Sequence, residues 1–289
     1  MRGGEKKGGG RDGGQGEGDR PPSSLPLPPS HSPPPRTVVV IPARDEERSV
    51  GAVVRALPRA ACAVVEVVVV DNGSRDGTAA AARAAGATVV AEPRAGYGRA
   101  CLAGLAHVAR QPPGGRPPDV VAFVDADLSD DPADLAAVLG PIWDGRADLV
   151  VGSRVLGARA GRVERGALLP QARWGNALAC ALIRLRWGAR FTDLGPFRAV
   201  RYGALAGLGM RDETFGWTVE MQVRAVRAGL RCAEVPVGYR RRVGRSKITG
   251  TVSGTVRAGA KILWTVGRHA VRTGPPRSGA PASSLRDGG

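Results

Sequence analysis

Two carboxylates separated by a single residue, Asp125 and Asp127, follow directly after the apolar run 120–124. Side chains at positions i and i+2 share one face of an extended chain, so both carboxylates can turn toward one point where the run ends. Hard oxygen ligands suit Mg²⁺ or Mn²⁺, which proteins bind through one or two carboxylates together with the phosphates of a ligand. The pair therefore predicts a metal site that would neutralise a diphosphate leaving group. A helix cap is the structural alternative for Asp127.

Acidic residues also follow two other apolar runs. Asp71 comes directly after the run 64–70, and Asp45 and Glu46 come shortly after the run 37–41. Asp71 is suited to accept hydrogen bonds from a base or a ribose, although a turn residue would look the same. If the three apolar runs are strands that end at one edge of a sheet, the acidic residues that follow them are predicted to line one crevice.

The segment 92–99, EPRAGYGR, precedes an Ala-rich stretch. Its glycines permit close backbone approach, and the start of a helix favours an anion. The segment is not a dinucleotide-binding fingerprint, because Cys101 stands where the last Gly of G-x-G-x-x-G would be, and no G-K-[ST] follows that would make it a P-loop.

The elements that must position these residues alternate along the chain. Short β-branched runs are continuously apolar rather than alternating, which indicates strands buried on both faces of a mostly parallel sheet sandwiched by helices, a Rossmann-like α/β fold. Right-handed crossovers place the carboxyl ends of such strands at one edge, where ligands bind. The predicted strands are 37–41, 64–70, 88–91, 120–124 and 149–151, and the predicted helices are about 46–57, 76–85, 98–110, 132–143 and 171–187.

Length and composition limit the possible domain organisation. The chain has 289 residues, of which 43% are apolar, enough for one large domain or two small ones and too many for a wholly disordered protein. Residues 1–36 contain nine Gly and eight Pro and are predicted to be a disordered tail, as is 272–289. The catalytic domain is expected over 37–248.

The four cysteines are far apart and form no C-x-x-C pair, so buried thiols in a reducing compartment are the simplest account. No N-terminal apolar stretch resembles a signal peptide, and no uncharged apolar window approaches the roughly 18 residues of a spanning helix. These features predict a cytoplasmic location, peripheral at the inner face of the plasma membrane if the chain meets a lipid surface.

The net charge is +16, and residues 240–289 hold eleven Lys or Arg against one acid. Such a basic end implies a phosphate-bearing ligand, an anionic membrane or nucleic acid, or else a solvated tail. Nucleic acid is the least favoured partner, because only 4% of residues are aromatic and no binding motif appears. Residues 249–271 combine branched apolar residues and a Trp with basic residues. They predict a basic amphipathic helix that lies in a membrane interface or packs on the sheet.

Several motifs occur in an order that resembles one family. PARDEE, VVVVDNGSRDGT, EPRAGYGRA, VDADLSDDP and VVGSR are followed by TDLGPFRAVR, GWTVEMQVRAVRAG and VPVGYRRRVGRSKITG. Together they resemble the inverting family 2 glycosyltransferases of GT-A fold, and most closely the bacterial relatives of dolichyl- and polyprenyl-phosphate mannose or glucose synthases. The resemblance covers residues 37–265.

The resemblance implies a nucleotide-sugar donor, such as a UDP- or GDP-sugar, and Mg²⁺ or Mn²⁺ as cofactor. Asp125 and Asp127 match its metal and diphosphate motif, with Asp127 and Arg154 also expected among the catalytic residues. The residues that match donor-binding positions are Pro42, Ala43, Asp45, Glu46, Asp71, Arg94, Gly98, Asp125 and Ala126. Those that match positions near the acceptor phosphate are Arg154, Arg242, Ser246 and Lys247.

The acceptor can be argued from chemistry. A hydroxyl acceptor needs a general base, for which Asp193 and Glu220 are the candidates, with loop capping or an ion pair with Arg as their structural alternative. A phosphate acceptor is already anionic and needs cations to position it. The abundance of Arg, Arg154 included, favours a lipid phosphate that receives a hexose, and a hydroxyl of a small molecule or glycan is the alternative.

Overall fold

The computed structural model describes residues 35–244 together with residues 264, 265, 267 and 268, which are helical. All of them belong to one compact unit that spans 34–289. The predicted tails fall outside the described residues apart from 35 and 36. Ser246, Lys247 and all but four residues of the predicted basic helix 249–271 also lie outside them.

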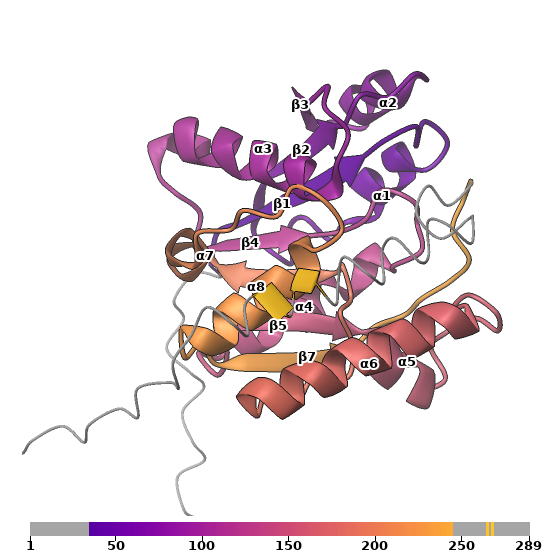
Figure 1. The fold of residues 1–289 in the computed structure, drawn as a ribbon. Coiled ribbons are helices and arrows are strands. Elements are labelled where there is room, and N and C mark those ends of the chain that lie inside the picture. Colours follow the sequence, from indigo (N-terminus) through magenta and orange to yellow (C-terminus); the bar gives the residue numbers. More distant parts are fainter. Residues whose placement is uncertain (1–34, 245–263, 266, 269–289) are drawn as a thin grey trace, which may run out of the picture. The chain divides into compact units, whose positions relative to one another are not determined.

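The described chain alternates strands with helices, as its apolar pattern predicts (Figure 1). The strands are β1 (Thr37–Ala43), β2 (Val64–Asp71), β3 (Thr88–Ala91), β4 (Val120–Phe123), β5 (Leu149–Ser153), β6 (Arg198–Arg201) and β7 (Cys232–Pro236). The α-helices are α1 (Val50–Ala56), α2 (Thr78–Ala84), α3 (Tyr97–Arg110), α4 (Leu135–Trp143), α5 (Arg154–Arg159), α6 (Pro170–Trp187), α7 (Tyr202–Leu208) and α8 (Trp217–Arg227). Two short 3₁₀ turns, η1 (Pro113–Gly115) and η2 (Pro132–Asp134), complete the set.

The strands form one sheet of order β3-β2-β1-β4-β6-β5-β7. All neighbouring pairs are parallel except those of β6, which runs antiparallel to both β4 and β5. The mostly parallel α/β sheet predicted from the sequence is therefore confirmed. After β1 the chain builds one half of the sheet through β2 and β3, and it then returns to place β4 on the other side of β1. The carboxyl ends of β1 and β4 flank this reversal, which is where open α/β sheets bind ligands.

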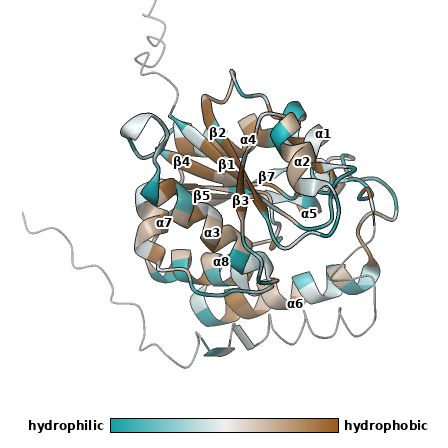
Figure 2. Ribbon diagram, turned by 90° about the horizontal axis from the view of Figure 1, so that it is seen from above, coloured by the Kyte–Doolittle hydropathy of each residue, from teal (hydrophilic) through white to brown (hydrophobic). Residues whose placement is uncertain are grey.

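Both faces of the sheet are covered, which explains the continuous apolar strands. β1, β4 and β5 are buried at every residue. Alternate strand residues pack into two cores: one includes Val40 and Phe123 with Cys101 of α3 and Trp217 of α8, and the other lies under α1 and α4. Figure 2 shows the apolar strands in the middle of the fold, between helices whose polar residues lie on the outside.

The sequence pattern missed β6, β7, α5, α7 and α8. β6 begins with Arg198, which has no exposed surface and donates hydrogen bonds to the carbonyl oxygens of Leu194, Gly195 and Thr218. Burial lowers the pKa of this guanidinium to about 10. A strand that carries a buried Arg at its first position has no apolar run by which the sequence could reveal the strand. The carbonyl oxygens around the side chain are what allow this Arg to be buried.

Candidate active site

A pocket of about 320 Å³ lies at the carboxyl edge of the sheet, where β1 and β4 end. It is bounded by the loop after β1, the Asp125–Asp127 segment after β4, the start of α3 and the loop that precedes α8. The lining residues are Pro42, Ala43, Arg44, Glu46, Asn72, Ala95, Gly96, Tyr97, Ala100, Asp125, Ala126, Asp127, Thr214, Phe215 and Arg242. The structure therefore brings together Pro42, Ala43, Glu46, Asp125, Ala126, Asp127 and Arg242 of the residues singled out in the sequence.

Asp127 is the best-connected carboxylate in this pocket. Its Oδ1 accepts a hydrogen bond of 2.9 Å from the backbone N–H of Ser129, and its Oδ2 lies 2.5 Å from Nη2 of Arg242. The Asp127 side chain is 5% exposed and that of Arg242 is 30% exposed. A buried carboxylate thus faces a cation that solvent can still reach.

Asp125 differs from Asp127 because its Oδ1 is buried and has no hydrogen-bond partner within the described part of the chain. Burial, and next the charge of Asp127, raise the pKa of Asp125 to about 7. A buried carboxyl that keeps one oxygen without a hydrogen-bond partner, beside a second carboxylate, is a site where two negative charges are unfavourable together. The arrangement therefore has room for one more positive charge.

A divalent cation fits this donor set. Two carboxylates that point into one pocket supply the hard oxygens that Mg²⁺ and Mn²⁺ prefer, and the unpartnered Oδ1 of Asp125 is an available oxygen. Among the residues described, no group of three or more His, Cys, Asp or Glu side chains could hold an ion alone. A site of two carboxylates leaves most of the coordination to water and to ligand phosphates, as is usual for Mg²⁺.

Two of the predicted donor-binding acids, Asp45 and Asp71, hold the loops after β1 and β2: Asp45 joins the two loops, and Asp71 fixes the turn within the second. Oδ1 of Asp45 accepts the N–H of Arg75, and the N–H of Asp45 donates to Oγ of Ser74. Oδ1 of Asp71 accepts the N–H of Ser74. Neither Asp45 nor Asp71 lines the pocket, and these contacts hold the two loops in place beside it.

Asn72 is a residue that the sequence reasoning did not single out. Its side chain is buried, its Nδ2 donates to the carbonyl oxygens of Glu92 and Arg94, and its Oδ1 accepts the N–H of Gly96. It therefore fixes the loop that leads into α3. The sequence feature that could have identified Asn72 is its position directly after a strand, in VVVVDN, because its side-chain amide can both donate and accept hydrogen bonds there. Tyr97, Thr214 and Phe215 also line the pocket and had no comparable signal.

The glycines at the start of α3 serve a different purpose from the one expected. A Cβ on Gly98 would collide with the carbonyl oxygen of Asp212, so this glycine makes room for another part of the chain. The N–H groups of Gly98 and Arg99 donate to the carbonyl oxygens of Thr214 and Glu213. These helix-terminal donors are therefore satisfied by protein, which argues against anion binding by those N–H groups.

Arg94 lies at the surface with its side chain 67% exposed and paired with Glu92 at 3.1 Å. The lining of the pocket does not include it. Its neighbours Ala95 and Gly96 do line the pocket, so the loop reaches the site while the Arg94 side chain remains on the outside.

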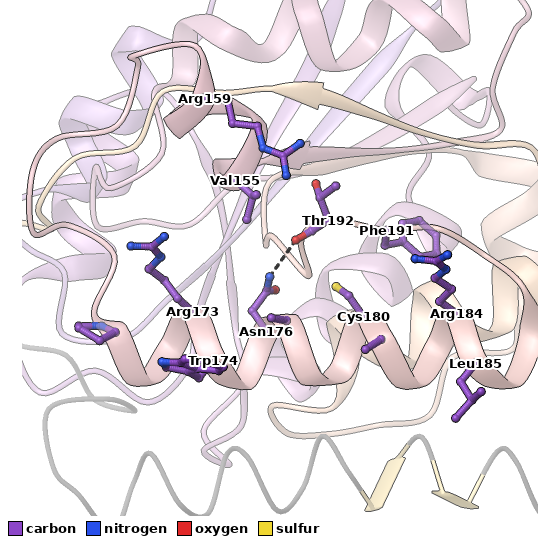
Figure 3. Close-up of a pocket in the computed structure, with 13 residues that line it drawn as sticks. Val155, Arg159, Arg173, Trp174, Asn176, Cys180, Arg184, Leu185, Phe191 and Thr192 are labelled. Atoms are coloured by element: carbon purple, nitrogen blue, oxygen red, sulfur yellow. Dashed lines mark hydrogen bonds between the residues drawn. The ribbon is translucent and has the colours of Figure 1, made fainter.

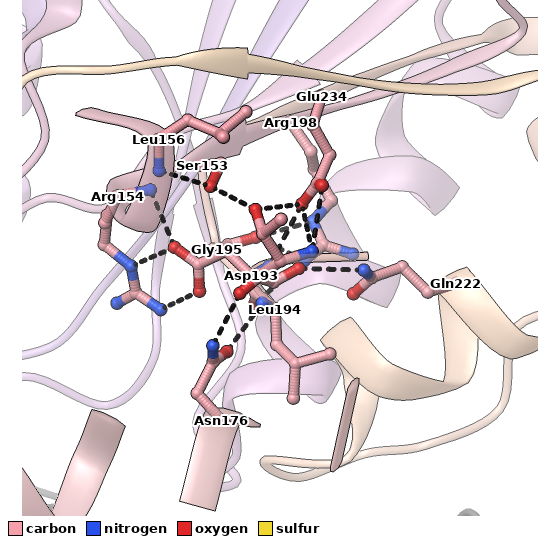
Figure 4. Close-up of polar contacts among 11 residues, drawn as sticks. Ser153, Arg154, Leu156, Asn176, Asp193, Leu194, Gly195, Arg198, Gln222 and Glu234 are labelled. Atoms are coloured by element: carbon pink, nitrogen blue, oxygen red, sulfur yellow. Dashed lines mark hydrogen bonds and ion pairs between the residues drawn. The ribbon is translucent and has the colours of Figure 1, made fainter. Parts of the chain in front are cut away.

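Arg154 and Asp193 form a second polar centre, at the end of β5 (Figure 4). Nε and Nη2 of Arg154 lie 2.8 and 2.7 Å from the two carboxylate oxygens of Asp193, and the backbone N–H of Arg154 donates to the same carboxylate. The Asp193 backbone is held in turn by Glu234 and Gln222. Because both oxygens of Asp193 are bound, the contact matches the ion-pair alternative rather than an available base.

Glu220 of α8 is also fully engaged. Its Oε2 accepts the N–H groups of Arg211 and Asp212, and its Oε1 lies 2.8 Å from Nε of Arg224. The residue is buried and does not line the pocket. It instead anchors the loop that presents Thr214 and Phe215 to the pocket.

A second, larger cavity of about 1030 Å³ lies along α6 and is open to solvent (Figure 3). We call it the α5–α6 groove. Its lining residues are Val155, Arg159, Pro170, Arg173, Trp174, Asn176, Ala177, Cys180, Ala181, Arg184, Leu185, Phe191 and Thr192. Val155 and Thr192 are the sequence neighbours of Arg154 and Asp193, so one end of the groove adjoins that ion pair. No helix within the described residues has the length and apolarity needed to cross a membrane.

Comparison with known proteins agrees with this architecture and these motifs. The family model for glycosyl transferase family 2 matches residues 38–206, more than half of the chain. The chain therefore belongs to glycosyltransferase family 2, as its motifs predicted.

Two curated relatives cover most of their own length. An uncharacterized glycosyltransferase of Mycobacterium tuberculosis is 39% identical over 220 residues, 75% of this chain and 92% of the relative. An undecaprenyl-phosphate mannosyltransferase of Micrococcus luteus is 32% identical over 233 residues, 76% of this chain and 90% of the relative.

Among solved structures, glucosyl-3-phosphoglycerate synthase of M. tuberculosis in complex with phosphoglyceric acid has a TM-score of 0.62. It is 23% identical and covers 82% of this chain and 80% of the other chain. The same synthase in complex with Mn²⁺, UDP and glucosyl-3-phosphoglycerate has a TM-score of 0.61 at 22% identity. At this level of identity the likeness concerns the fold.

Proposed function

We propose that this glycosyltransferase moves a hexose from a UDP- or GDP-sugar to a polyprenyl-type lipid phosphate with the help of Mg²⁺ or Mn²⁺. The observation that carries the donor half is the buried Asp125–Asp127 pair, which lies in a pocket at the sheet reversal and has one carboxylate oxygen without a partner. When bound, a divalent cation supplies positive charge that stabilises the nucleoside diphosphate as it leaves. Structural neighbours with Mn²⁺ and UDP support this assignment.

The pocket residues suit the parts of a nucleotide-sugar. Asp125 and Asp127 hold the metal and with it the diphosphate, and Arg242 at the pocket wall offers a guanidinium to a phosphate oxygen. Pro42 and Ala43 form an apolar wall against which a base can pack. Asp45 acts by holding the two loops together, and Asp71 acts by fixing the turn at Ser74 within its own loop, so their contribution to donor binding is to position this wall.

The acceptor half rests on the second polar centre and the groove beside it. Arg154 is held by Asp193, and its side chain is 19% exposed, so it is oriented before any ligand arrives. A lipid phosphate brings its own negative charge to such a cation and needs no base to remove a proton. That requirement agrees with the engagement of Asp193 and Glu220 in other contacts, and the name of the M. luteus relative supports the same acceptor class.

The α5–α6 groove offers a place for an apolar chain. The side chains of Trp174 and Leu185 on α6 are 78% and 84% exposed. The same helix carries Arg173, Arg184 and Arg186 and contains no acid. Exposed apolar side chains among arginines fit the interface of an anionic membrane, which supports a membrane source of the acceptor beside the groove. We therefore propose peripheral contact with the inner membrane face through α6.

One assay tests the donor and the acceptor together. Purified protein is incubated with radiolabelled UDP-glucose, GDP-mannose or related donors, Mn²⁺ or Mg²⁺, and vesicles that contain polyprenyl phosphate. Label in the organic-extractable fraction supports the proposal, and label that remains only in water-soluble product rejects the lipid acceptor. A thermal-shift screen with the same donors identifies the nucleotide, because a ligand that binds the native state raises the melting temperature.

A hydroxyl acceptor on a small phosphorylated molecule is the second candidate. It is favoured by the likeness in fold to glucosyl-3-phosphoglycerate synthase. This reading needs a base, and Asp193 would have to release Arg154 to serve as one. Transfer to phosphoglyceric acid in the absence of vesicles would establish it.

A further inference from the structure

We propose that Arg242 and the divalent cation alternate at the same atom, Oδ2 of Asp127. In the metal-free protein the guanidinium occupies the cation position. When a divalent cation is bound at Asp127, the Arg242 side chain would leave this carboxylate and would bind a phosphate of the donor. This inference rests on the proposed metal site at Asp125 and Asp127, and it adds an exchange with the metal to the donor-phosphate role proposed for Arg242, which the sequence predicted on the acceptor side.

The first support is the geometry at Asp127. Nη2 of Arg242 lies 2.5 Å from Oδ2, and the other carboxylate oxygen, Oδ1, already accepts the N–H of Ser129. A metal that uses the Asp127 side chain therefore has Oδ2 as its natural ligand. A guanidinium and a divalent cation at the same oxygen repel each other in a partly buried site, so the binding of one disfavours the other.

The second support is the way in which the chain holds Arg242. The backbone N–H of Val243 donates to the carbonyl oxygen of Asp127, and that of Arg240 donates to the carbonyl oxygen of Ser129. Two backbone hydrogen bonds thus tie the Arg242 segment directly to the metal motif. The side chain can leave Asp127 while its backbone stays at the pocket, so it remains within reach of a diphosphate.

The neighbouring arginines supply the contrast. Arg240 pairs with Asp131 at 3.2 Å, and Arg241 pairs with Glu164 at 3.4 Å. Both pairs are largely exposed, and neither acid lines the pocket. Of three consecutive arginines, each with an acidic partner, Arg242 alone is paired with a proposed metal ligand.

An exchange of this kind couples metal binding to donor binding. Without a nucleotide, the metal must break the Arg242–Asp127 pair and leave the guanidinium without a partner. With a diphosphate present, the guanidinium gains a new anionic partner, so the metal binds more tightly. Removal of the guanidinium should therefore strengthen metal binding in the absence of nucleotide and weaken the coupling between metal and nucleotide.

The experiment measures Mn²⁺ affinity by EPR spectroscopy of free Mn²⁺, with and without UDP or GDP. It compares the wild-type chain with Arg242→Gln and with two control variants, Arg240→Gln and Arg241→Gln, which remove the same charge from adjacent positions. Asp127→Asn is included to identify the metal site. Circular dichroism establishes that each variant is folded.

We expect Arg242→Gln to bind Mn²⁺ about fivefold more tightly than the wild type in the absence of nucleotide, and the two controls to differ from the wild type by less than about twofold. We also expect the nucleoside diphosphate to enhance Mn²⁺ affinity less in Arg242→Gln than in the wild type. Equal changes in all three arginine variants, or weaker Mn²⁺ binding by Arg242→Gln, overturn the exchange.

The failure of the exchange can be told apart from the failure of the proposed function. If the wild type binds Mn²⁺ and Asp127→Asn does not, the metal site stands whatever Arg242→Gln does. If Asp127→Asn binds Mn²⁺ as the wild type does, with and without nucleotide, the metal assignment fails and the exchange fails with it.

Discussion

The two charged centres of this protein use the same kinds of side chain in opposite ways. At Asp193 the Arg154 guanidinium engages both carboxylate oxygens, and the acid is 1% exposed. At Asp127 the Arg242 guanidinium engages one oxygen from a side chain that is 30% exposed, next to Asp125, whose Oδ1 has no partner. Both oxygens of the Asp193 carboxylate are thus already paired, and the Arg154 guanidinium is oriented before an acceptor phosphate arrives. At the Asp125–Asp127 pair one carboxylate oxygen has no partner and the guanidinium that pairs with Asp127 is partly exposed, as a site for a metal and a diphosphate requires.

The comparison is tested most strongly by Asp127→Asn. Loss of this carboxylate removes a proposed metal ligand, so we expect sugar transfer to fall by about a thousandfold or more, because metal stabilisation of a leaving group contributes several kcal/mol. The measurement is the initial rate of label transfer at saturating Mn²⁺. Asp131→Asn is the matched control, since Asp131 lies in the same segment and pairs with Arg240 at the surface. Near-normal turnover by Asp127→Asn would show that the metal assignment is wrong.

Breaking the Arg154–Asp193 ion pair should lower the stability of the protein. Asp193→Asn leaves the Arg154 guanidinium partly buried without its partner, and we expect the free energy of unfolding to fall by about 3–5 kcal/mol. Urea denaturation followed by circular dichroism measures it. Asp131→Asn removes an exposed partner and should cost less than about 1 kcal/mol. Equal losses in the two variants would mean that burial does not distinguish the pairs.

The buried Asp125–Asp127 pair should make the stability of the metal-free protein depend on pH. The pKa of Asp125 is raised from 3.8 to about 7 when folded, so across this window the folded chain binds more protons than the unfolded chain. Lowering the pH from about 8 to about 5.5 should therefore raise the contribution of Asp125 to stability. Burial also raises the pKa of Asp130, which acts in the same direction.

The variant that isolates this effect is Asp125→Asn. It removes the titrating group, so the difference in melting temperature between the two pH values should be smaller than in the wild type, with EDTA present in both cases. An unchanged difference would assign the pH dependence to Asp130 or to other groups.

The smallest effect is expected at Arg94. Its exposed side chain pairs with Glu92 outside the pocket, so Arg94→Ala should change kcat/KM for the donor by less than about threefold. Arg242→Ala is the comparison, because that side chain lines the pocket and should cost more. A larger loss in Arg94→Ala than in Arg242→Ala would place the donor differently from our proposal.

Much of the fold could be predicted from the sequence because the parallel strands are buried on both faces of the sheet. The apolar run before Asp71 and the run before Asp125 identified β2 and β4, and hydrophobic pattern suffices for such strands. β6 could not be predicted in this way, because its buried Arg198 is stabilised by carbonyl oxygens of the preceding loop, at Leu194 and Gly195, and of Thr218 in α8. Hydrophobic pattern reports burial in an apolar environment and carries no sign of a buried charge that is satisfied by backbone carbonyl oxygens.

The sequence by itself determined the family, the parallel sheet and the acids that follow its strands, because these depend on local patterns and ordered motifs. Only the tertiary structure decided which acids keep a free oxygen. Asp45 and Asp193 look like site residues in the sequence, yet one oxygen of Asp45 accepts the backbone N–H of Arg75 and both oxygens of Asp193 are engaged by the Arg154 guanidinium. The availability of a charge depends on partners that are far away in the chain, and those partners are chosen only when the chain has folded.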